Sequence, residues 1–449
     1  MLAALRKELR RTFSLSVPIT LGLVGQSLYG VFDTVLVANI LGEHALSAAT
    51  LGNNITWVPL LFACGLCIAI PVLTAQALGA GRRESVPAIL RHGLLIGIGV
   101  SILGAALTCA FVCGNGFELL RQPPDVAADA KRYACIVASS LPVAAGFQAV
   151  KFFRDATGGQ WISLFWMLAG LVVKILLSWM LMSGAFFFPD WGLEGAAAGT
   201  FVARVFALAG IVLHKRLVCN FREGFSFART RENLRISFPS ALHIVFEAGI
   251  FIVSPFFMGW IGDSAIAANQ VVLTLSGLAY MFPLGISQAL SIRIGAAFGR
   301  RNMPRIRIIF AGATGATLTA IAVAAAVFIA VRSKIPPLFN LGDEAAELAE
   351  NFLIVAGAYM LFDAFQTLAA GTLRGVSDVR IIAVAAFFSY WVVGCPTSLV
   401  LAFPLGLGGV GIWIGLATGL ALIACILGVR VYKNLSRPRV PAPAAESAF

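Results

Sequence analysis

Residues 16–50 read SVPITLGLVGQSLYGVFDTVLVANILGEHALSAAT, and a related stretch, SFPSALHIVFEAGIFIVSPFFMGWIGDSAIAANQ, occupies residues 237–270. Pro18 in the first stretch corresponds to Pro239 in the second, at an offset of 221 residues that becomes 220 after one gap. Glycine and alanine positions farther along the chain correspond at the same offset. The chain is therefore an internal duplication, and its composition decides what kind of structure the two copies build.

The composition is that of a protein that spans a membrane many times. The chain has 449 residues, of which 59% are hydrophobic and only 12% charged, and its mean hydropathy is +0.89. A soluble domain carries about 25% charged residues. Outer-membrane barrels show alternating segments of about 10 residues, whereas the apolar runs here reach roughly 20 residues or more, the length of a membrane helix. The fold class we expect is all-α integral membrane.

Twelve apolar segments are long enough to cross a hydrocarbon core of about 30 Å at a rise of about 1.5 Å per residue. They are expected at residues 13–38, 46–79, 92–114, 130–152, 160–187, 192–217, 234–260, 264–298, 306–331, 348–372, 380–404 and 409–433.

The duplication divides these twelve segments into two sets of six. Six is an even number, so both copies keep the same orientation, and parallel repeats are related by a pseudo-twofold axis along the membrane normal. We expect two six-helix bundles, at residues 1–222 and 223–437, joined by the basic segment 214–235. The Pro- and Ala-rich tail, 438–449, is predicted to be disordered.

The basic residues predict the orientation. Of the 33 Lys and Arg residues, 26 fall on the loops and ends of one side, 5 on the other side, and 2, Lys174 and Arg204, inside spans. Cytoplasmic loops carry the excess of Lys and Arg, so both ends of the chain are predicted to be cytoplasmic. The net charge of +12 is then a feature of topology. Nucleic-acid binding would need a basic face on a folded soluble domain, and we expect no nucleic-acid partner.

Three acidic residues lie inside predicted spans: Asp33, Glu247 and Asp363. A charged group in lipid costs a few kcal/mol or more, so such groups usually face a cavity or one another. Glu247 and Asp363 both lie roughly 20 Å below the outer ends of their spans at helical rise. Tyr359 precedes Asp363 by four residues and shares its helix face.

This group supplies oxygen ligands only, which suits a hard cation such as Na+. The same carboxyls could instead carry a proton. A third interpretation is that each acid merely hydrogen-bonds a neighbouring helix. The sequence leaves these three possibilities open.

From about residue 13 to residue 433, the chain resembles the MATE family (multidrug and toxic compound extrusion), NorM-type branch. Three stretches carry the resemblance: FDTVLVANILGEHALSA, ANQVVLTLSGLAYMFPLGISQALSIRIGAAFG and FDAFQTLAAGTLRG. The resemblance implies a coupling-cation site for Na+ or H+ at Glu247, Asp363 and Tyr359. It implies a protonation site at Asp33.

The N-terminal half departs from the family pattern. Where relatives usually have Asn or Asp at two positions four apart, this sequence has Lys174 and Ser178. Arg204 stands where a neutral polar residue is commoner. A Lys side chain has three donors and no acceptor, so it cannot ligate a cation. Either Lys174 neutralises Asp33, or it lines a central cavity and favours an anionic or zwitterionic substrate; both basic side chains could also simply snorkel or pair.

The expected function is secondary antiport: export of drugs or other toxic organic compounds driven by inward Na+ or H+. No enzymatic activity and no cofactor besides the coupling ion are expected. The expected partners are a small organic substrate and the lipid bilayer, and we expect a monomer in the inner membrane. The alternative is a flippase or exporter of an anionic or lipid-linked substrate, for which only Lys174 and Arg204 argue. The Cys pairs 64/67 and 109/113 are interpreted as ordinary packed thiols.

Overall fold

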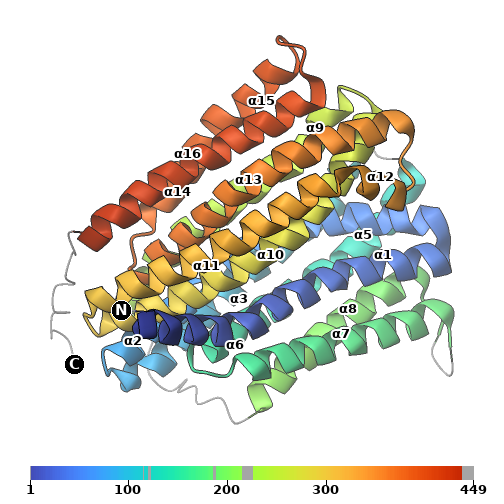
Figure 1. Cartoon of the computed structure of the whole chain (residues 1–449). Helices are drawn as coiled ribbons and strands as arrows, with labels where there is room; N and C mark the ends of the chain where they lie inside the picture. Colours follow the sequence, from blue (N-terminus) through green and yellow to red (C-terminus); the bar gives the residue numbers. More distant parts are fainter. Residues whose placement is uncertain (1, 115, 120–122, 186–188, 215–225, 437–449) are drawn as a thin grey trace. The chain divides into compact units, whose positions relative to one another are not determined.

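The computed structural model describes residues 2–114, 116–119, 123–185, 189–214 and 226–436. Every regular element in these residues is helical, as Figure 1 shows, so the predicted all-α class is confirmed. The predicted disordered tail lies outside the described residues, as does part of the predicted linker. The helices are α1 (Leu2–Leu66), α2 (Ala69–Gly79), α3 (Val86–Cys113), α4 (Gly116–Leu119), α5 (Pro124–Ser139), α6 (Leu141–Ala156), α7 (Gln160–Ser183), α8 (Gly192–Leu213), α9 (Phe227–Gly259), α10 (Asp263–Gly299), α11 (Met303–Ala330), α12 (Ile335–Leu338), α13 (Asp343–Gly375), α14 (Arg380–Ala386), the π-helical η3 (Phe387–Gly394), α15 (Cys395–Ala402) and α16 (Gly408–Ser436).

Eleven of the described helical segments are long and apolar enough to cross a membrane, and one of them, Ala4–Gly79, covers 76 residues. At about 1.5 Å per residue it is far longer than one crossing requires. Gly42 breaks it with φ 82° and ψ −173°, backbone angles that glycine adopts readily. This break falls between the first two predicted spans, so the segment provides two crossings and the predicted twelve are recovered.

The chain divides into two compact units. One, which we call the N-terminal unit, comprises Pro18–Thr74 and Arg83–Val245. The other, the C-terminal unit, comprises Met1–Val17, Ala75–Arg82 and Phe246–Phe449. Packing therefore divides the chain inside α1, α2 and α9, whereas the division predicted from the repeat falls between helices, at residue 222, and stays a prediction.

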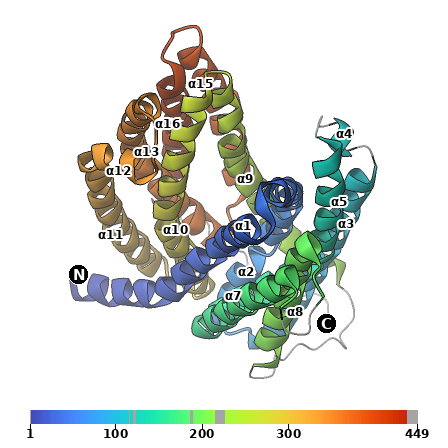
Figure 2. The ribbon, with the colours of Figure 1, turned by 90° about the vertical axis from the view of Figure 1, so that its right-hand side faces the viewer.

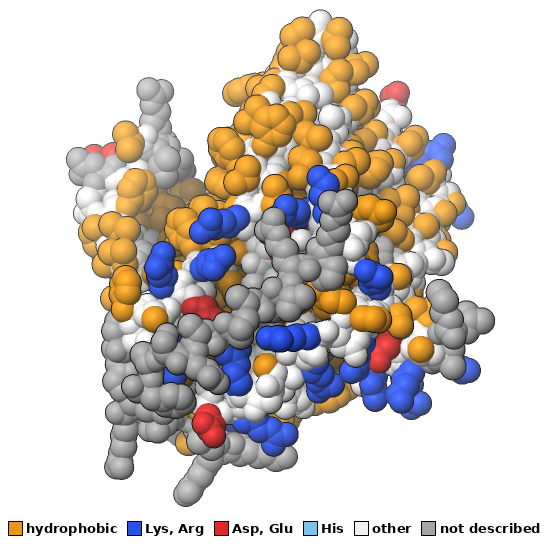
Figure 3. Space-filling view, turned by 90° about the vertical axis from the view of Figure 1, so that its left-hand side faces the viewer, with side chains coloured by type: hydrophobic (Ala, Val, Ile, Leu, Met, Phe, Trp, Pro, Cys, Tyr) orange, Lys and Arg blue, Asp and Glu red, His pale blue; other side chains and the backbone are white. Residues whose placement is uncertain are grey.

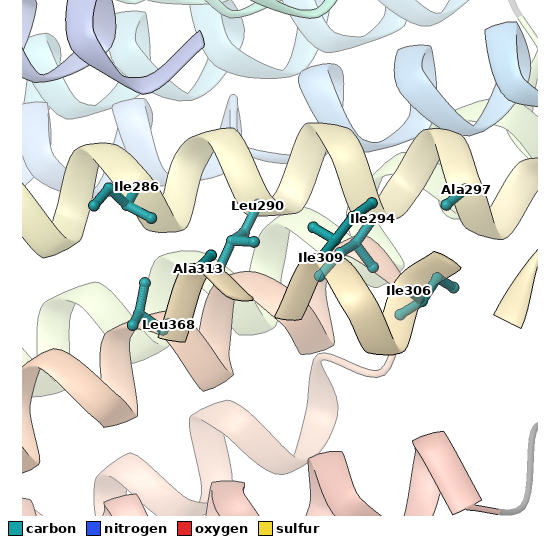
Figure 4. Packing of buried hydrophobic residues seen from close by; sticks show 8 residues of the cluster. All are labelled: Ile286, Leu290, Ile294, Ala297, Ile306, Ile309, Ala313 and Leu368. Carbon is teal, nitrogen blue, oxygen red and sulfur yellow. The ribbon is translucent and has the colours of Figure 1, made fainter. Parts of the chain in front are cut away.

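In the C-terminal unit, α10, α11 and α13 run side by side in both ribbon views (Figures 1 and 2). Aliphatic side chains from all three fill the space between them (Figure 4). Small residues let α10 and α13 approach closely, since a Cβ on Gly371 would lie 2.3 Å from Ser287 Oγ. Such close contacts drive helix association where lipid removes the hydrophobic advantage. They fix the register of α13, which carries Asp363.

The duplication is visible in matching helix contacts. In the N-terminal unit, a Cβ on Gly199 of α8 would lie 2.4 Å from Ser178 Oγ of α7. In the C-terminal unit, a Cβ on Gly415 of α16 would lie 2.2 Å from Ser398 Oγ of α15. Ser178 and Ser398 are 220 residues apart, the offset of the sequence repeat. The two copies therefore pack their last two long helical segments through the same small-residue contact.

A second contact has the symmetry of the repeat itself. A Cβ on Gly79 would lie 2.2 Å from the carbonyl oxygen of Ala296, and a Cβ on Gly299 would lie 2.2 Å from that of Gln76. Both pairs lie within the C-terminal unit. Adding 220 to one pair of residue numbers gives the other pair. A reciprocal contact of this kind is what a pseudo-twofold axis between the repeats produces.

Lys and Arg side chains are frequent on the face drawn in Figure 3, and acidic side chains are few there. This is the asymmetry that the positive-inside rule associates with the cytoplasmic side. It is consistent with the orientation predicted from the sequence.

Candidate cation-coupling site

The two acids predicted to share a site in the C-terminal unit are joined by a third side chain. Glu247 lies on α9 and Asp363 on α13, and Gln366 follows Asp363 by one helical turn. The Gln366 Nε2 amide donates to Glu247 Oε1 at 2.5 Å and to Asp363 Oδ1 at 3.1 Å. One amide group thus bridges both carboxylates and holds them around a common point.

The bridging residue is fully enclosed. Gln366 is 0% exposed and Asp363 7%. Among the described residues, the Gln366 Oε1 atom has no hydrogen-bond donor. A buried acceptor without a donor costs free energy, of the order of 1–3 kcal/mol. Next to two carboxylates, this oxygen is a ligand that a bound cation would satisfy.

A tryptophan fixes the position of Glu247. The indole Nε1 of Trp391 donates to the carbonyl oxygen of Phe246 at 3.2 Å, one residue before the acid. A Cβ on Gly249 would lie 2.8 Å from the same ring, so α9 must carry a glycine there to approach it. Trp391 lies in η3, and π-helical segments occur frequently at functional sites.

Two tyrosines border the pair of acids, with different roles. The Tyr280 hydroxyl donates to Glu247 Oε1 at 3.5 Å, a long hydrogen bond. Tyr359, the predicted third ligand, is 4% exposed, and its ring packs on Trp413 with centroids 5.6 Å apart. Its hydroxyl lies near Ser276. Tyr359 is thus close to Asp363 along the helix but is held as part of the wall, and its role as a ligand stays a prediction.

The chemistry of these side chains fits a small hard cation. The donors are two carboxylates, the free amide oxygen of Gln366 and the hydroxyl of Thr367, which accepts from Gln366 Nε2 at 3.0 Å. All are oxygen atoms, as Na+ requires. Within the described residues no three His, Cys, Asp or Glu side chains gather as a metal centre. Any cation held here would therefore depend on this carboxylate pair and on neutral oxygens.

The N-terminal unit holds its own buried charge pair. Lys174 Nζ lies 2.6 Å from Asp33 Oδ2, and the two side chains are 3% and 12% exposed. The same ammonium donates to the carbonyl oxygen of Tyr29 at 3.0 Å and lies 4.8 Å from the centre of its ring. The structure therefore favours neutralisation of Asp33 by Lys174, one of the two readings that the sequence leaves open.

The other predicted residues of this unit are placed differently. Ser178 is fully buried, and its hydroxyl donates to the carbonyl oxygen of Ala196 at 3.4 Å. Arg204 Nη1 donates to Ser140 Oγ at 2.5 Å. Among the described residues, no ion pair joins Arg204 to a carboxylate. Ser178 thus serves helix packing, whereas Arg204 brings a positive charge with a neutral partner. The cavity-lining role of both stays a prediction.

Gln366 is the site residue that the sequence interpretation missed. A glutamine inside a span gives a weaker signal than an acid, because an amide is neutral and often only bonds a neighbouring helix. Its position offered a clue, since residues three apart share a helix face. Reading the polar residues at i+3 and i+4 from Asp363 would have found it.

Comparison with known proteins gives a consistent result. The family model MatE matches twice, at residues 18–180 and 239–400. The two matches start 221 residues apart, which is the offset of the internal repeat.

Curated relatives match over nearly the whole chain. A protein of Agrobacterium fabrum described as "Probable multidrug resistance protein NorM" is 33% identical, over 94% of this chain and 93% of its own length. The protein of the same description from Bradyrhizobium diazoefficiens is 32% identical, over 96% of this chain and 95% of its own.

Solved structures share the fold. The eukaryotic MATE transporter AtDTX14 superposes with a TM-score of 0.84 at 23% identity, covering 96% of both chains. A variant of the Vibrio cholerae MATE transporter VcmN gives 0.87 at 17% identity, covering 98% of this chain and 99% of its own. A MOP superfamily transporter from Pyrococcus furiosus gives 0.86 at 18% identity, covering 96% of both.

Proposed function

The chain belongs to the MATE family of multi-pass membrane transporters, and from this premise we propose that it exports organic compounds in exchange for inward Na+ or H+. The drug resistance for which its NorM relatives are named suggests drugs and other toxic compounds as substrates. The observation that carries the proposal is the buried Glu247–Gln366–Asp363 group, with its free amide oxygen.

Exchange requires that ion and substrate favour different conformations of one protein. A ligand shifts a conformational equilibrium only by its difference in affinity for the two states. In the described state the Gln366 amide takes the place between the carboxylates. Binding of Na+ or H+ at either carboxylate weakens this bridge, because the amide then loses a charged acceptor. The bridge thus gives the coupling ion a local change by which to bias the equilibrium.

The test is transport in sealed vesicles. Purified protein in liposomes should move a fluorescent cationic dye outward only when a Na+ or a pH gradient is imposed. An enzyme would show no gradient-dependent flux, and a channel would pass its solute down the solute's own gradient without an opposing ion. Dye movement that is equal with and without both ion gradients would rule out antiport. Gradients of the two ions imposed one at a time identify the coupling ion.

A second candidate is an exporter or flippase of an anionic or lipid-linked substrate. Arg204 favours it, because this intramembrane cation has Ser140 as its described partner and no described ion pair. Lys174 argues for it less, since Asp33 neutralises its charge. In the same vesicles, gradient-driven movement of anionic dyes or lipid-linked anions in preference to cations would support this candidate.

We also propose that the protein is a monomer in the inner membrane with both ends in the cytoplasm. Reporter tags at the N-terminus, in the linker 214–235 and at the C-terminus should all report cytoplasmic. The physical reason is the excess of Lys and Arg on one side of the twelve spans. An external signal from the linker would mean an odd number of crossings in the first repeat and would contradict the parallel duplication.

A further inference from the structure

Two cysteines from separate helices meet at one end of the N-terminal unit. Cys113 is the last residue of α3, and Cys135 lies in α5. Their Sγ atoms are 3.7 Å apart. Cys109, one helical turn before Cys113, also lies next to the Cys135 thiol. The cysteines of α3 read as packed thiols from the sequence, because the partner from α5 comes close only in three dimensions.

The pair lies in a polar layer, away from the apolar middle of the helices. The Lys131 ammonium donates to the carbonyl oxygen of Cys113 at 3.0 Å. Charged pairs surround it: Arg132 lies 3.3 Å from Glu194, and His44 lies 3.6 Å from Asp129. Cys113 itself is exposed and Cys135 partly so. Small oxidants and protein thiol oxidases can therefore reach the pair.

The orientation places this end of the unit outside the cytoplasm. Basic residues precede α3, and α3 is the third crossing, so its last residue emerges on the outer side; this step rests on the proposed topology. Compartments outside the bacterial cytoplasm are oxidising and allow disulfides to persist. A disulfide bond is about 2.05 Å long, so the two sulfur atoms need to close by roughly 1.7 Å.

We propose that Cys113 and Cys135 form a disulfide in the cell, which joins the outer ends of α3 and α5, with Cys109 as the alternative partner of Cys135. Two S–H bonds break and one S–S bond forms. The two electrons and two protons pass to a disulfide-bearing oxidant, either a protein thiol oxidase or oxidised glutathione, which becomes a dithiol or two thiols. The product closes the connection between α3 and α5 into a loop.

The experiment counts protected thiols. Cells are quenched in acid, free thiols are blocked with N-ethylmaleimide in denaturant, disulfides are reduced, and the released thiols are tagged with a polyethylene-glycol maleimide. The native protein should shift on a gel by two tags. Cys135→Ser should shift by none, because it lacks the shared partner. Cys425→Ser, which removes a distant exposed cysteine, should still shift by two.

Variants of α3 identify the partner. Cys109→Ser should keep two protected thiols, and a disulfide-linked peptide containing Cys113 and Cys135 should appear by mass spectrometry. The oxidised native protein should also melt at a higher temperature than the reduced form, because a cross-link restricts the unfolded chain. That difference should vanish in Cys135→Ser.

Native protein with no protected thiols in cells would overturn the proposal. Incubating the same purified protein with oxidised glutathione then assigns the failure. A disulfide that forms in the tube but not in cells means that the orientation is wrong, and one that forms in neither means that the thiols cannot meet. Neither measurement uses transport, so the antiport proposal stands or falls separately.

Discussion

Asp363→Asn should lower gradient-driven export by at least about tenfold, equivalent to ~1.4 kcal/mol, while the amount of protein in the membrane stays unchanged. The substitution is nearly isosteric, so the close packing of α13 on α10 should survive. The charge, however, is lost, and with it the attraction for a cation and the capacity to take up a proton. The measurement is the initial rate of dye export from liposomes under an imposed Na+ or pH gradient.

Glu247→Gln is the matching change on α9 and should have the same effect, because both carboxylates bind the same Gln366 amide. The control is Asp343→Asn, which removes a carboxylate from the exposed first turn of the same helix, α13. We expect this control to export at the native rate. It separates loss of the buried charge from a general loss of negative charge.

The same pair of acids predicts a proton signal. Two carboxylates held close together repel each other, so one retains its proton until a cation compensates. Adding Na+ to purified protein in weak buffer should therefore release protons, recorded as a fall in pH together with a heat of binding. The release should be absent in Asp363→Asn and in Glu247→Gln. If Asp363→Asn exports as fast as the native protein, Asp363 is a packing residue and the proposed mechanism is wrong.

The spans were predictable because membrane helices carry a strong local signal. A crossing needs about 20 apolar residues, and the repeat offset supplied an independent check on their number. The exact helix ends were not predictable, since the hydropathy pattern reports the hydrocarbon core and not the helix. α1 shows this clearly: it begins at Leu2, far before the predicted start at residue 13, because a helix continues into water where its residues favour it.

The site was partly predictable for a related reason. Charged residues are costly in lipid, so Glu247, Asp363 and Asp33 could be singled out from sequence alone. What joins them depends on side-chain placement in three dimensions. Gln366 bridges two acids on different helices, and Lys174 reaches Asp33 from a helix 141 residues away. No local pattern encodes such pairs, and the sequence could only leave the role of Lys174 open.

Lys174→Ala should destabilise the N-terminal unit, by about 3 kcal/mol, because it leaves the buried Asp33 carboxylate without its partner. Asp33→Asn removes the same charge from the other side, so the double variant should be more stable than Lys174→Ala alone. The measurement is the melting temperature of purified protein in detergent, where a loss of this size lowers Tm by roughly 6–12 °C. Recovery of a part of that loss in the double variant is the expected result.

A second buried pair in the same unit provides the control. Lys151 Nζ lies 3.0 Å from Asp155 Oδ2, and both side chains are less exposed than those of the first pair, at 4% and 2%. Lys151→Ala should also destabilise the protein, but Asp33→Asn should not rescue it, because the stranded charge is then Asp155. Rescue of both lysine variants by Asp33→Asn would mean a general effect of removing negative charge. If the Lys174 and Asp33 defects simply add, the two residues do not interact in the membrane, and Lys174 belongs to the substrate cavity. Lys174→Asn should in that case shift export toward cationic substrates.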